Sequence, residues 1–310
     1  MEYQEFVEAF RQILSDKSGI DREKITFEKE GGRLAEGGDR LLIEFADHEE
    51  STEICALHTE ELYELYRGGK TEEELAQEVI RDIEEARGAQ VYRKARELSD
   101  YEKIRGELFV RLINEERNRK SLEDAIYRTI GDIALVVYAR MAENENGISS
   151  TKILGKFTEV WKKDREEIFT EALLNTYFIN PPRIYRWEEL IFDPDYGGEN
   201  FMDLASEHSL VKTAMGNCLS TERKINGAVA VFLPGVAQRL YNLLDSDFYI
   251  VFTSIHEAMI HNVDTVRKED LQEILNDITD RVTPKNEVLS SCIYRYSHDT
   301  KQFSCVSKGP

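Results

Sequence analysis

The sequence contains no long hydrophobic run. The longest, residues 133–139, has the length of a strand and falls far short of the ~18 apolar residues that suggest a membrane-spanning helix. Residues 1–5 are acidic and lack the basic start and apolar stretch of a secretory signal. We therefore expect a soluble, cytoplasmic protein whose 310 residues form one large domain or two of ordinary size.

Cysteine is also scarce. The chain has four cysteines, namely Cys55, Cys218, Cys292 and Cys305. No two of them are spaced as CxxC, and we expect no metal site and no cofactor. The last two flank a predicted hairpin with its turn near residues 298–300. If Tyr296 pairs with Phe303 across that hairpin, Cys292 and Cys305 are diagonal neighbours and not opposed. Four free thiols are therefore expected, with a disulfide between the last two left open.

Basic residues are outnumbered, 40 against 60 acidic ones, which gives a formal charge of −20 at pH 7. This balance disfavours direct contact with nucleic acid or an anionic membrane. The acids alternate with Arg and Lys along predicted helices such as the one in residues 71–98, as on ordinary solvated helix faces. The alternative is an acidic decoy that occupies a nucleic-acid-binding protein, which would require one continuous acidic stripe.

One order of elements recurs three times in the second half of the chain: strand, turn, strand, helix. The predicted ranges are 133–141, 148–154 and 166–176; 215–221, 228–233 and 235–244; and 248–253, 258–263 and 268–282. Asn146-Gly147 and Asn226-Gly227 are predicted hairpin turns, because Asn-Gly supplies the positive φ that tight turns need. The pattern predicts an α+β fold, with a largely antiparallel sheet built from successive β-hairpin-plus-helix units.

The first part of the chain has a different pattern. It predicts a helix at 3–14, strands at 24–28, 40–45 and 53–57, a helix at 59–66, and a further helix that starts at Thr71 with a Thr71/Glu74 capping box. A boundary near residue 99 gives an N-terminal α/β region, 1–98, and a hairpin-and-helix region, 99–310, and whether they pack as one body stays open. Within the second region, the segment from Phe178 to Ser209 is rich in proline and glycine. Long irregular segments often carry function, so this 178–209 segment is a candidate site.

A second candidate is the turn formed by Ser254, Ile255, His256 and Glu257. His256 and His261 resemble a zinc-protease pair, but they are five residues apart, and that motif needs a spacing of four on one helical face. No metal site is expected there. The segment is instead predicted to be a turn between two strands, and such loop tips can bind a ligand.

Three further residues are weaker catalytic candidates beside His256. Cys218 follows Gly216-Asn217, but a nucleophilic cysteine needs a nearby base, and its apolar strand favours a small buried residue. Asp132 and Glu257 each directly precede an apolar strand, where burial can shift the proton affinity of a carboxylate. The simpler reading is that both face water at a sheet edge.

Several stretches together are similar to a known family. They are residues 1–3 with Phe6, then 100–104, 111–116 with Asn118, 132–136, 172–176, 226–230, 234–236 and 254–257. The chain resembles a family of bacterial proteins, found mostly in gut-anaerobe Firmicutes and known only as a domain of unknown function, the 5688 group. Phe252-Thr253 stand where that family usually shows a proline and a serine. The resemblance brings no established activity, so it assigns no catalytic roles.

Three functions therefore remain open. The first is a non-catalytic binding protein that contacts a protein partner through its sheet surface or the 178–209 segment, and the lack of a cofactor motif or nucleophile elbow favours it. The second is an enzyme of unrecognised type that uses His256 and Glu257. The third is the acidic decoy. The oligomeric state is not predicted.

Overall fold

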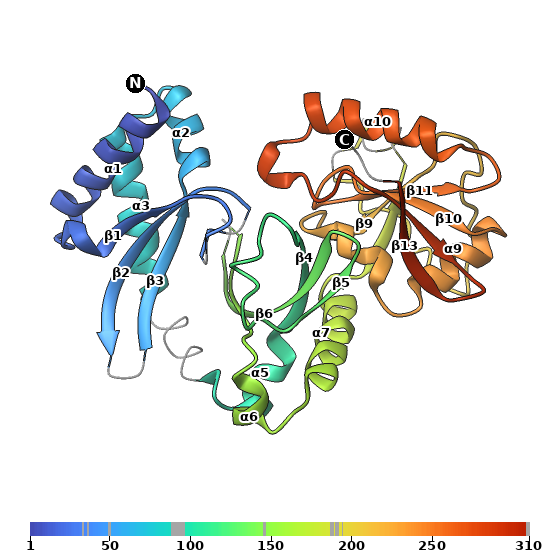
Figure 1. Ribbon diagram of the computed structural model, residues 1–310, viewed down its shortest axis with the longest axis horizontal. Coiled ribbons are helices and arrows are strands. Elements are labelled where there is room, and N and C mark those ends of the chain that lie inside the picture. The colour runs from blue at the N-terminus through green and yellow to red at the C-terminus, as the bar shows by residue number, and fades with distance from the viewer. Residues whose placement is uncertain are drawn as a thin grey trace. The chain divides into compact units, whose positions relative to one another are not determined.

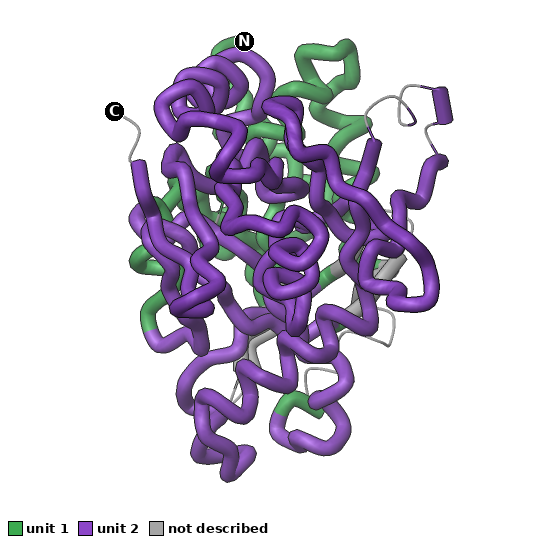
Figure 2. Tube along the Cα trace, turned by 90° about the vertical axis from the view of Figure 1, so that its right-hand side faces the viewer, with its two compact units in different colours: residues 1–98, 117–123, 141–149 green, residues 99–116, 124–140, 150–310 purple. Residues whose placement is uncertain are grey.

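The computed structural model describes the chain apart from residues 33, 36, 49–50, 88–96, 145–146, 187–188, 190–191, 194 and 308–310. The chain divides into two compact units, coloured separately in Figure 2. Unit 1 comprises residues 1–98, 117–123 and 141–149, and unit 2 comprises 99–116, 124–140 and 150–310. The fold is α+β with antiparallel sheets, as the sequence predicts.

Among the described residues, unit 1 contains a three-stranded antiparallel sheet, in the order β1-β2-β3, and three α-helices (Figure 1). The elements are α1 (Tyr3–Ser18), β1 (Ile25–Glu28), β2 (Arg40–His48), β3 (Ser51–His58), α2 (Thr59–Arg67) and α3 (Glu72–Arg87). Phe6, Phe10 and Leu14 on α1 are buried in one cluster with Leu41 and Ile43 of β2. Their helical spacing and the alternation along the strands together produce this core.

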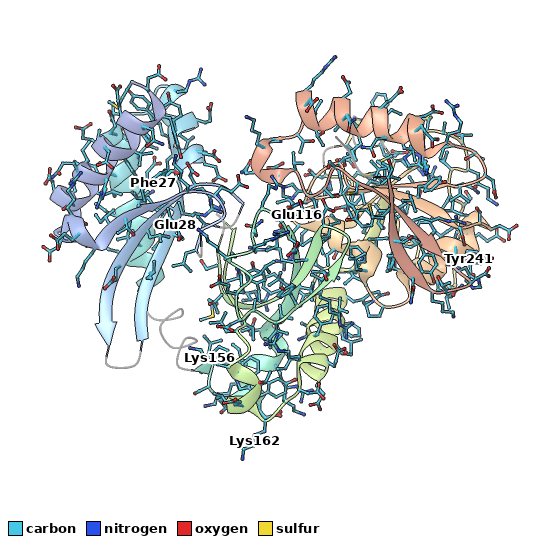
Figure 3. The ribbon with its side chains drawn as sticks, viewed as in Figure 1. Phe27, Glu28, Glu116, Lys156, Lys162 and Tyr241 are labelled. Atoms are coloured by element: carbon cyan, nitrogen blue, oxygen red, sulfur yellow. The ribbon has the colours of Figure 1, made fainter. Side chains whose placement is uncertain are left out.

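Two local features of unit 1 follow directly from its sequence. On β1, Phe27 packs against the core, whereas the carboxylate of the next residue, Glu28, accepts a hydrogen bond from the Leu34 N–H at 2.9 Å (both labelled in Figure 3). The capping box before α3 is confirmed: the Glu74 N–H donates to Thr71 Oγ1 at 3.2 Å, and the Thr71 N–H donates to Glu74 Oε2 at 2.9 Å.

Unit 2 holds most of two further sheets. The first, in the order β4-β6-β5 with β7 paired to β6, is made of β4 (Leu108–Asn114), β5 (Tyr127–Ile130), β6 (Ile133–Asn144) and β7 (Gly147–Lys152). The second, in the order β13-β12-β10-β11-β9-β8, is made of β8 (Pro182–Tyr185), β9 (Asn217–Thr221), β10 (Phe248–Val251), β11 (Ala258–Asn262), β12 (Ile293–Ser297) and β13 (Gln302–Ser307). Within the described residues, the α-helices of this unit include α5 (Tyr101–Ile104), α6 (Phe157–Trp161), α7 (Arg165–Ile179), α9 (Val236–Leu244) and α10 (Lys268–Arg281).

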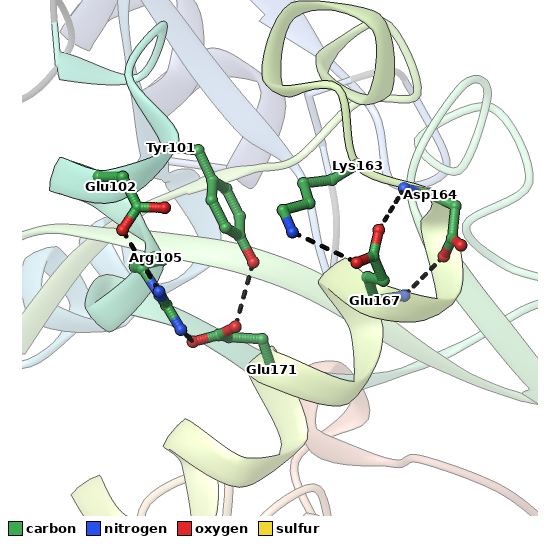
Figure 4. A network of polar contacts seen from close by, with 7 residues as sticks. All are labelled: Tyr101, Glu102, Arg105, Lys163, Asp164, Glu167 and Glu171. Carbon is green, nitrogen blue, oxygen red and sulfur yellow. Dashed lines mark hydrogen bonds and ion pairs between the residues drawn. The ribbon is translucent and has the colours of Figure 1, made fainter.

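Helix α7 begins where its sequence directs it to begin. The Glu167 N–H donates to the Asp164 carboxylate at 2.7 Å, and the Asp164 N–H donates back to Glu167, which completes a capping box (Figure 4). One turn further along, Glu171 accepts hydrogen bonds from Arg105 at 2.8 Å and from the Tyr101 hydroxyl at 3.2 Å. Burial, together with the Glu171 charge, raises the pKa of Tyr101 to about 12. The network fixes α7 against the segment that contains α5.

The second predicted hairpin unit is wrong. Residues 228–233 were predicted as a strand, but Gly227–Phe232 form a 3₁₀ helix, η3, and Asn226-Gly227 is not a hairpin turn. The reason lies in β9, which is already paired on one side with β8 and on the other with β11. Since residues 228–231 are buried all round, their apolar run has no period that distinguishes strand from helix. The first and third of the predicted hairpins do contain paired strands, although Asn146 of the first hairpin turn lies outside the described residues.

Among the helices within the described ranges, none is both long and apolar enough to cross a bilayer.

Candidate functional site

The turn from Ser254 to Glu257 lies along the edge of the six-stranded sheet that is formed by the ends of its strands, where β10 ends and β11 begins. It connects β10 to β11, as predicted. The end of β9 lies at the same edge, because β9 pairs with the beginning of β11 through Leu219 and Ala258. Further along the chain, the short 3₁₀ helix η4 (Lys285–Glu287) reaches this edge too, since the Ile255 N–H donates to the Glu287 carbonyl at 2.8 Å.

His256 is held by protein groups at both ring nitrogens. The Asn226 N–H donates to Nδ1 at 3.0 Å, and Nε2 lies 3.5 Å from Glu287 Oε1. A nitrogen that accepts a hydrogen bond carries no proton, so the neutral imidazole has its proton on Nε2, facing Glu287. The His256 carbonyl also accepts a hydrogen bond from the Ser220 hydroxyl at 2.7 Å. The ring therefore helps to fix the turn, with Nδ1 bound to the backbone and Nε2 beside the Glu287 carboxylate.

Glu257 points toward β9 and away from this arrangement. Its Oε1 accepts a hydrogen bond from the Thr253 hydroxyl at 3.1 Å, and its Oε2 lies 3.8 Å from Cys218 Sγ. Burial of Cys218, and secondarily the Glu257 charge, raise the pKa of the thiol well above its usual range. Cys218 is thus a neutral buried thiol, whereas a nucleophilic cysteine needs a lowered pKa.

Asp132 is a structural carboxylate with a different set of partners. It accepts hydrogen bonds from the Ser290 hydroxyl at 2.7 Å, from Asn114 Nδ2 at 3.2 Å and from the Tyr294 hydroxyl. Burial, followed by the contact with Asp132, raises the pKa of Tyr294. Gly131, at φ +62°, allows the Tyr294 ring to approach, because a Cβ there would lie 2.5 Å from the hydroxyl oxygen. Asp132 thus connects the β5–β6 turn to β12 and is only partly exposed to water.

The turn-region candidates therefore come together, but as structural contacts. His256, Glu257 and Cys218 lie around one turn, with Asn226 and Glu287 as partners that the sequence did not single out. No local pattern marks Glu287, which lies thirty-one residues further along the chain. Within the described part of the chain, no group of three or more His, Cys, Asp or Glu residues could hold a metal ion.

His261 is a buried residue that sequence reasoning noted only for its spacing. It is 6% exposed, and burial lowers its pKa to about 4, against a weaker opposite effect of a hydrogen bond to the Ala214 backbone. Its Nδ1 has no hydrogen-bond partner among the described residues. Gly216, at φ +70°, lies directly against the ring. The position of Gly216 just before strand β9 was the one sequence signal that the His261 side chain needs room there.

The 178–209 segment is anchored at its base and exposed beyond it. Its strand β8 pairs with β9, and an antiparallel bridge joins Ile184 to Glu199 with two hydrogen bonds of 3.1 and 2.7 Å. Arg186 and Glu199 add an ion pair at 2.6 Å. Further along, the Phe201 carbonyl accepts a hydrogen bond from Arg239 Nε of α9 at 2.8 Å, and the Phe201 ring is fully buried.

The end of the same segment borders an open cavity of about 510 Å³. It is lined by Leu204, Ser206, Glu207, His208, Ser209, Arg239 and Leu243. The cavity contains none of the four candidate catalytic residues. This cavity therefore borders the 178–209 segment.

Comparison with known proteins gives one match. The model of a family described as "Family of unknown function (DUF5688)" matches residues 3–298, so the chain belongs to this family. The match confirms the resemblance noted from the sequence. No curated protein and no solved structure matches the chain.

Proposed function

We propose that this is a non-catalytic, cytoplasmic interaction protein that binds a protein partner through the 178–209 segment. The observation that carries the proposal is the exposure of large apolar side chains. Phe192 is 86% exposed, Leu204 82% and Phe178 76%, which makes them three of the four most exposed large hydrophobic residues among those described. Single exposed apolar residues are ordinary, whereas a contiguous exposed apolar patch marks an interaction site, and we propose that these side chains of one segment contact the partner together.

The anchoring of the segment supports this proposal. The Ile184–Glu199 bridge and the Arg186–Glu199 ion pair bring the two ends of the intervening loop together. Compact surface loops of about 6–16 residues with adjacent ends are frequently functional. Phe192 lies between these anchored ends, so a partner would meet it on a loop whose base is already ordered. Less conformational entropy is then lost on binding.

The charges near Phe192 indicate the chemistry of the partner. Glu189, Asp193 and Asp195 lie within three residues of it, and all three are exposed. Asp193 shapes the loop as well, since its carboxylate accepts a hydrogen bond from the Asp195 N–H at 3.0 Å. An exposed phenyl ring among carboxylates suits a partner surface with an apolar pocket bordered by Arg or Lys.

The hydrogen bond that His256 Nδ1 accepts from the backbone and the neutral thiol of Cys218 favour this function over an enzyme built on the 254–257 turn. The contacts of these residues hold the turn in place. Catalysis by His256 and Glu257 would require them to exchange those contacts for a substrate.

A site-specific crosslinking experiment tests the proposal. A photoreactive phenylalanine analogue replaces Phe192 in the full chain, and in a matched variant it replaces Val282, which is 74% exposed but lies outside the segment. After irradiation in cell extract, we expect one discrete adduct from position 192 that is absent from position 282. The adduct should weaken at high salt and with D193N/D195N, because the partner surface is basic. No adduct at position 192, or the same adducts from both positions, would overturn the proposal.

A further inference from the structure

Two of the four thiols lie near each other on neighbouring strands. Cys292 lies immediately before β12, and Cys305 lies on the neighbouring strand β13. Cys305 pairs with Tyr294, so Cys292, two residues before Tyr294, is its diagonal neighbour, and the nearby Cys305 thiol contributes to a raised pKa of Cys292. Cys305 Sγ donates a hydrogen bond to the Ser307 carbonyl at 3.4 Å. The predicted pairing of Tyr296 with Phe303 is confirmed, but a register shift follows between Ile293 and Tyr294. The irregularity lies between Cys292 and the regular part of the ladder, in which Cys305 is paired with Tyr294.

We propose that Cys292 and Cys305 form an oxidation site that closes to an intramolecular disulfide when the protein meets a peroxide. Cys305 is the half-buried member on the outermost strand of its sheet, whereas Cys292 is only 4% exposed. Cys305 is therefore the thiol that the oxidant reaches, and Cys292 is the resolving thiol.

The reaction balances in two steps. In the first, Cys305 attacks the peroxide and becomes a sulfenic acid, and the peroxide is reduced to water or, for an organic peroxide, to the alcohol. In the second, the Cys292 sulfur attacks the Cys305 sulfur and expels its hydroxyl, which leaves as water with the Cys292 proton. Two thiols are oxidised, one S–S bond forms, and each peroxide supplies both oxidising equivalents.

The surroundings of Cys292 make its reaction dependent on this partner. Burial raises its pKa to about 12, and the charge of Asp132 adds to the effect, so Cys292 is a neutral thiol in the reduced protein. A neutral buried thiol reacts slowly with oxidants in solution. A sulfenic acid on the neighbouring Cys305 is a reactant held close to Cys292, and this proximity compensates for the low thiolate fraction of Cys292.

The other two cysteines lack this arrangement and provide controls. The Cys218 sulfur faces the Glu257 carboxylate, and Cys55 lies on β3 of unit 1. Burial raises the pKa of the Cys55 thiol to about 11, so both controls are also neutral thiols. If thiol proximity decides the outcome, these two remain reduced under conditions that oxidise the pair.

The disulfide would close the β12–β13 hairpin at its open end. Strand β13 is the last strand of its sheet and pairs only with β12 in the described sheet order. A covalent link between its end and the start of β12 restricts separation of this edge strand from the sheet. Oxidation should therefore raise the urea concentration at the unfolding midpoint and slow amide exchange in β13.

The test uses the full folded chain and hydrogen peroxide, followed by denaturation, thiol counting and peptide mapping. We expect the number of free thiols to fall from four to two, with the loss of two hydrogen atoms in the intact mass and one linked peptide pair that contains Cys292 and Cys305. Dithiothreitol should restore all four thiols. C218A and C55A should each form the same link.

Two outcomes would overturn the proposal. One is the retention of all four free thiols after peroxide treatment, or the conversion of Cys305 to sulfinic acid without a link to Cys292. The other is a disulfide between chains, or a pairing that involves Cys55 or Cys218. C292A provides a second check in the folded protein, since Cys305 sulfenic acid should then accumulate and be captured by dimedone.

Discussion

The backbone N–H of Asn226 donates to Nδ1 of His256 at 3.0 Å, and this contact determines which imidazole nitrogen carries the proton. Replacing His256 by Ala leaves the Asn226 N–H without its partner. We expect H256A to lower the free energy of unfolding by about 1–3 kcal/mol. H256N should cost less, because its side-chain oxygen can take the place of Nδ1. Urea unfolding measures both variants, and equal losses would contradict the assigned role of Nδ1.

Cys218 should be almost inert in the native protein. Its pKa is raised by burial and by Glu257, so only a small fraction is thiolate near neutral pH. We expect its alkylation rate to rise about tenfold per pH unit, without a plateau up to about pH 9. Mass spectrometry of iodoacetamide-treated peptides provides the rate, with the denatured chain as the control. A plateau near neutral pH would instead reveal an activated thiol and would favour the enzyme hypothesis.

Gly227 should tolerate no side chain. An ideal Cβ at this position would lie 2.6 Å from the His256 carbonyl oxygen and 2.7 Å from the Thr221 nitrogen, and both atoms belong to the backbone. We expect G227A to lower the free energy of unfolding by about 2–4 kcal/mol. G106A is the matched control, because Gly106 also lies in a 3₁₀ helix but has nothing within 4 Å of its Cβ position. Equal effects of the two substitutions would show that the contact at the 254–257 turn is not rigid.

The segment that follows Gly227 shows which elements of the fold can be predicted from the sequence and which cannot. Strands β10 and β11 and helix α10 were predictable because their side chains alternate or recur every three to four residues, as with Leu271 and Leu275. Residues 228–231 have no such period, since every side chain is buried. Their conformation is set by β9, whose two sides are already paired, and that pairing is not encoded nearby in the chain.

The candidate site, too, was predictable from the sequence only in part. The position of His256 in a turn between strands was predictable from local residues. Its partners were not, because Glu287 and Asn226 are about thirty residues away in opposite directions along the chain. The 178–209 segment was predictable as irregular from its prolines and glycines, but the exposure of Phe192 depends on tertiary packing.

Asp132 should be strongly coupled to Tyr294. Removing the carboxylate leaves the hydroxyls of Ser290 and Tyr294 without their acceptor in a largely buried place. We expect D132A to cost about 3 kcal/mol or more and Y294F less, with a coupling energy of about 1–3 kcal/mol in a double-mutant cycle. Denaturant unfolding of the two single variants and the double variant provides the cycle. Additive effects would show that the Tyr294 hydroxyl does not depend on Asp132.

His261 should make the protein less stable in mild acid. Its pKa in the folded chain is about 4, below the ordinary value of 6.5, so at intermediate pH the unfolded chain binds the proton more readily. The stabilisation is therefore present above about pH 6.5 and is lost as the pH falls toward about 4, by up to about 3 kcal/mol. H261Q keeps a nitrogen donor near the position of Nε2 but does not titrate. As the pH falls through this window, we expect the wild type to lose unfolding free energy relative to H261Q. Effects of carboxylates are common to both proteins and cancel in this difference. A difference that stays constant from neutral pH to pH 4 would show that His261 is not held neutral by burial.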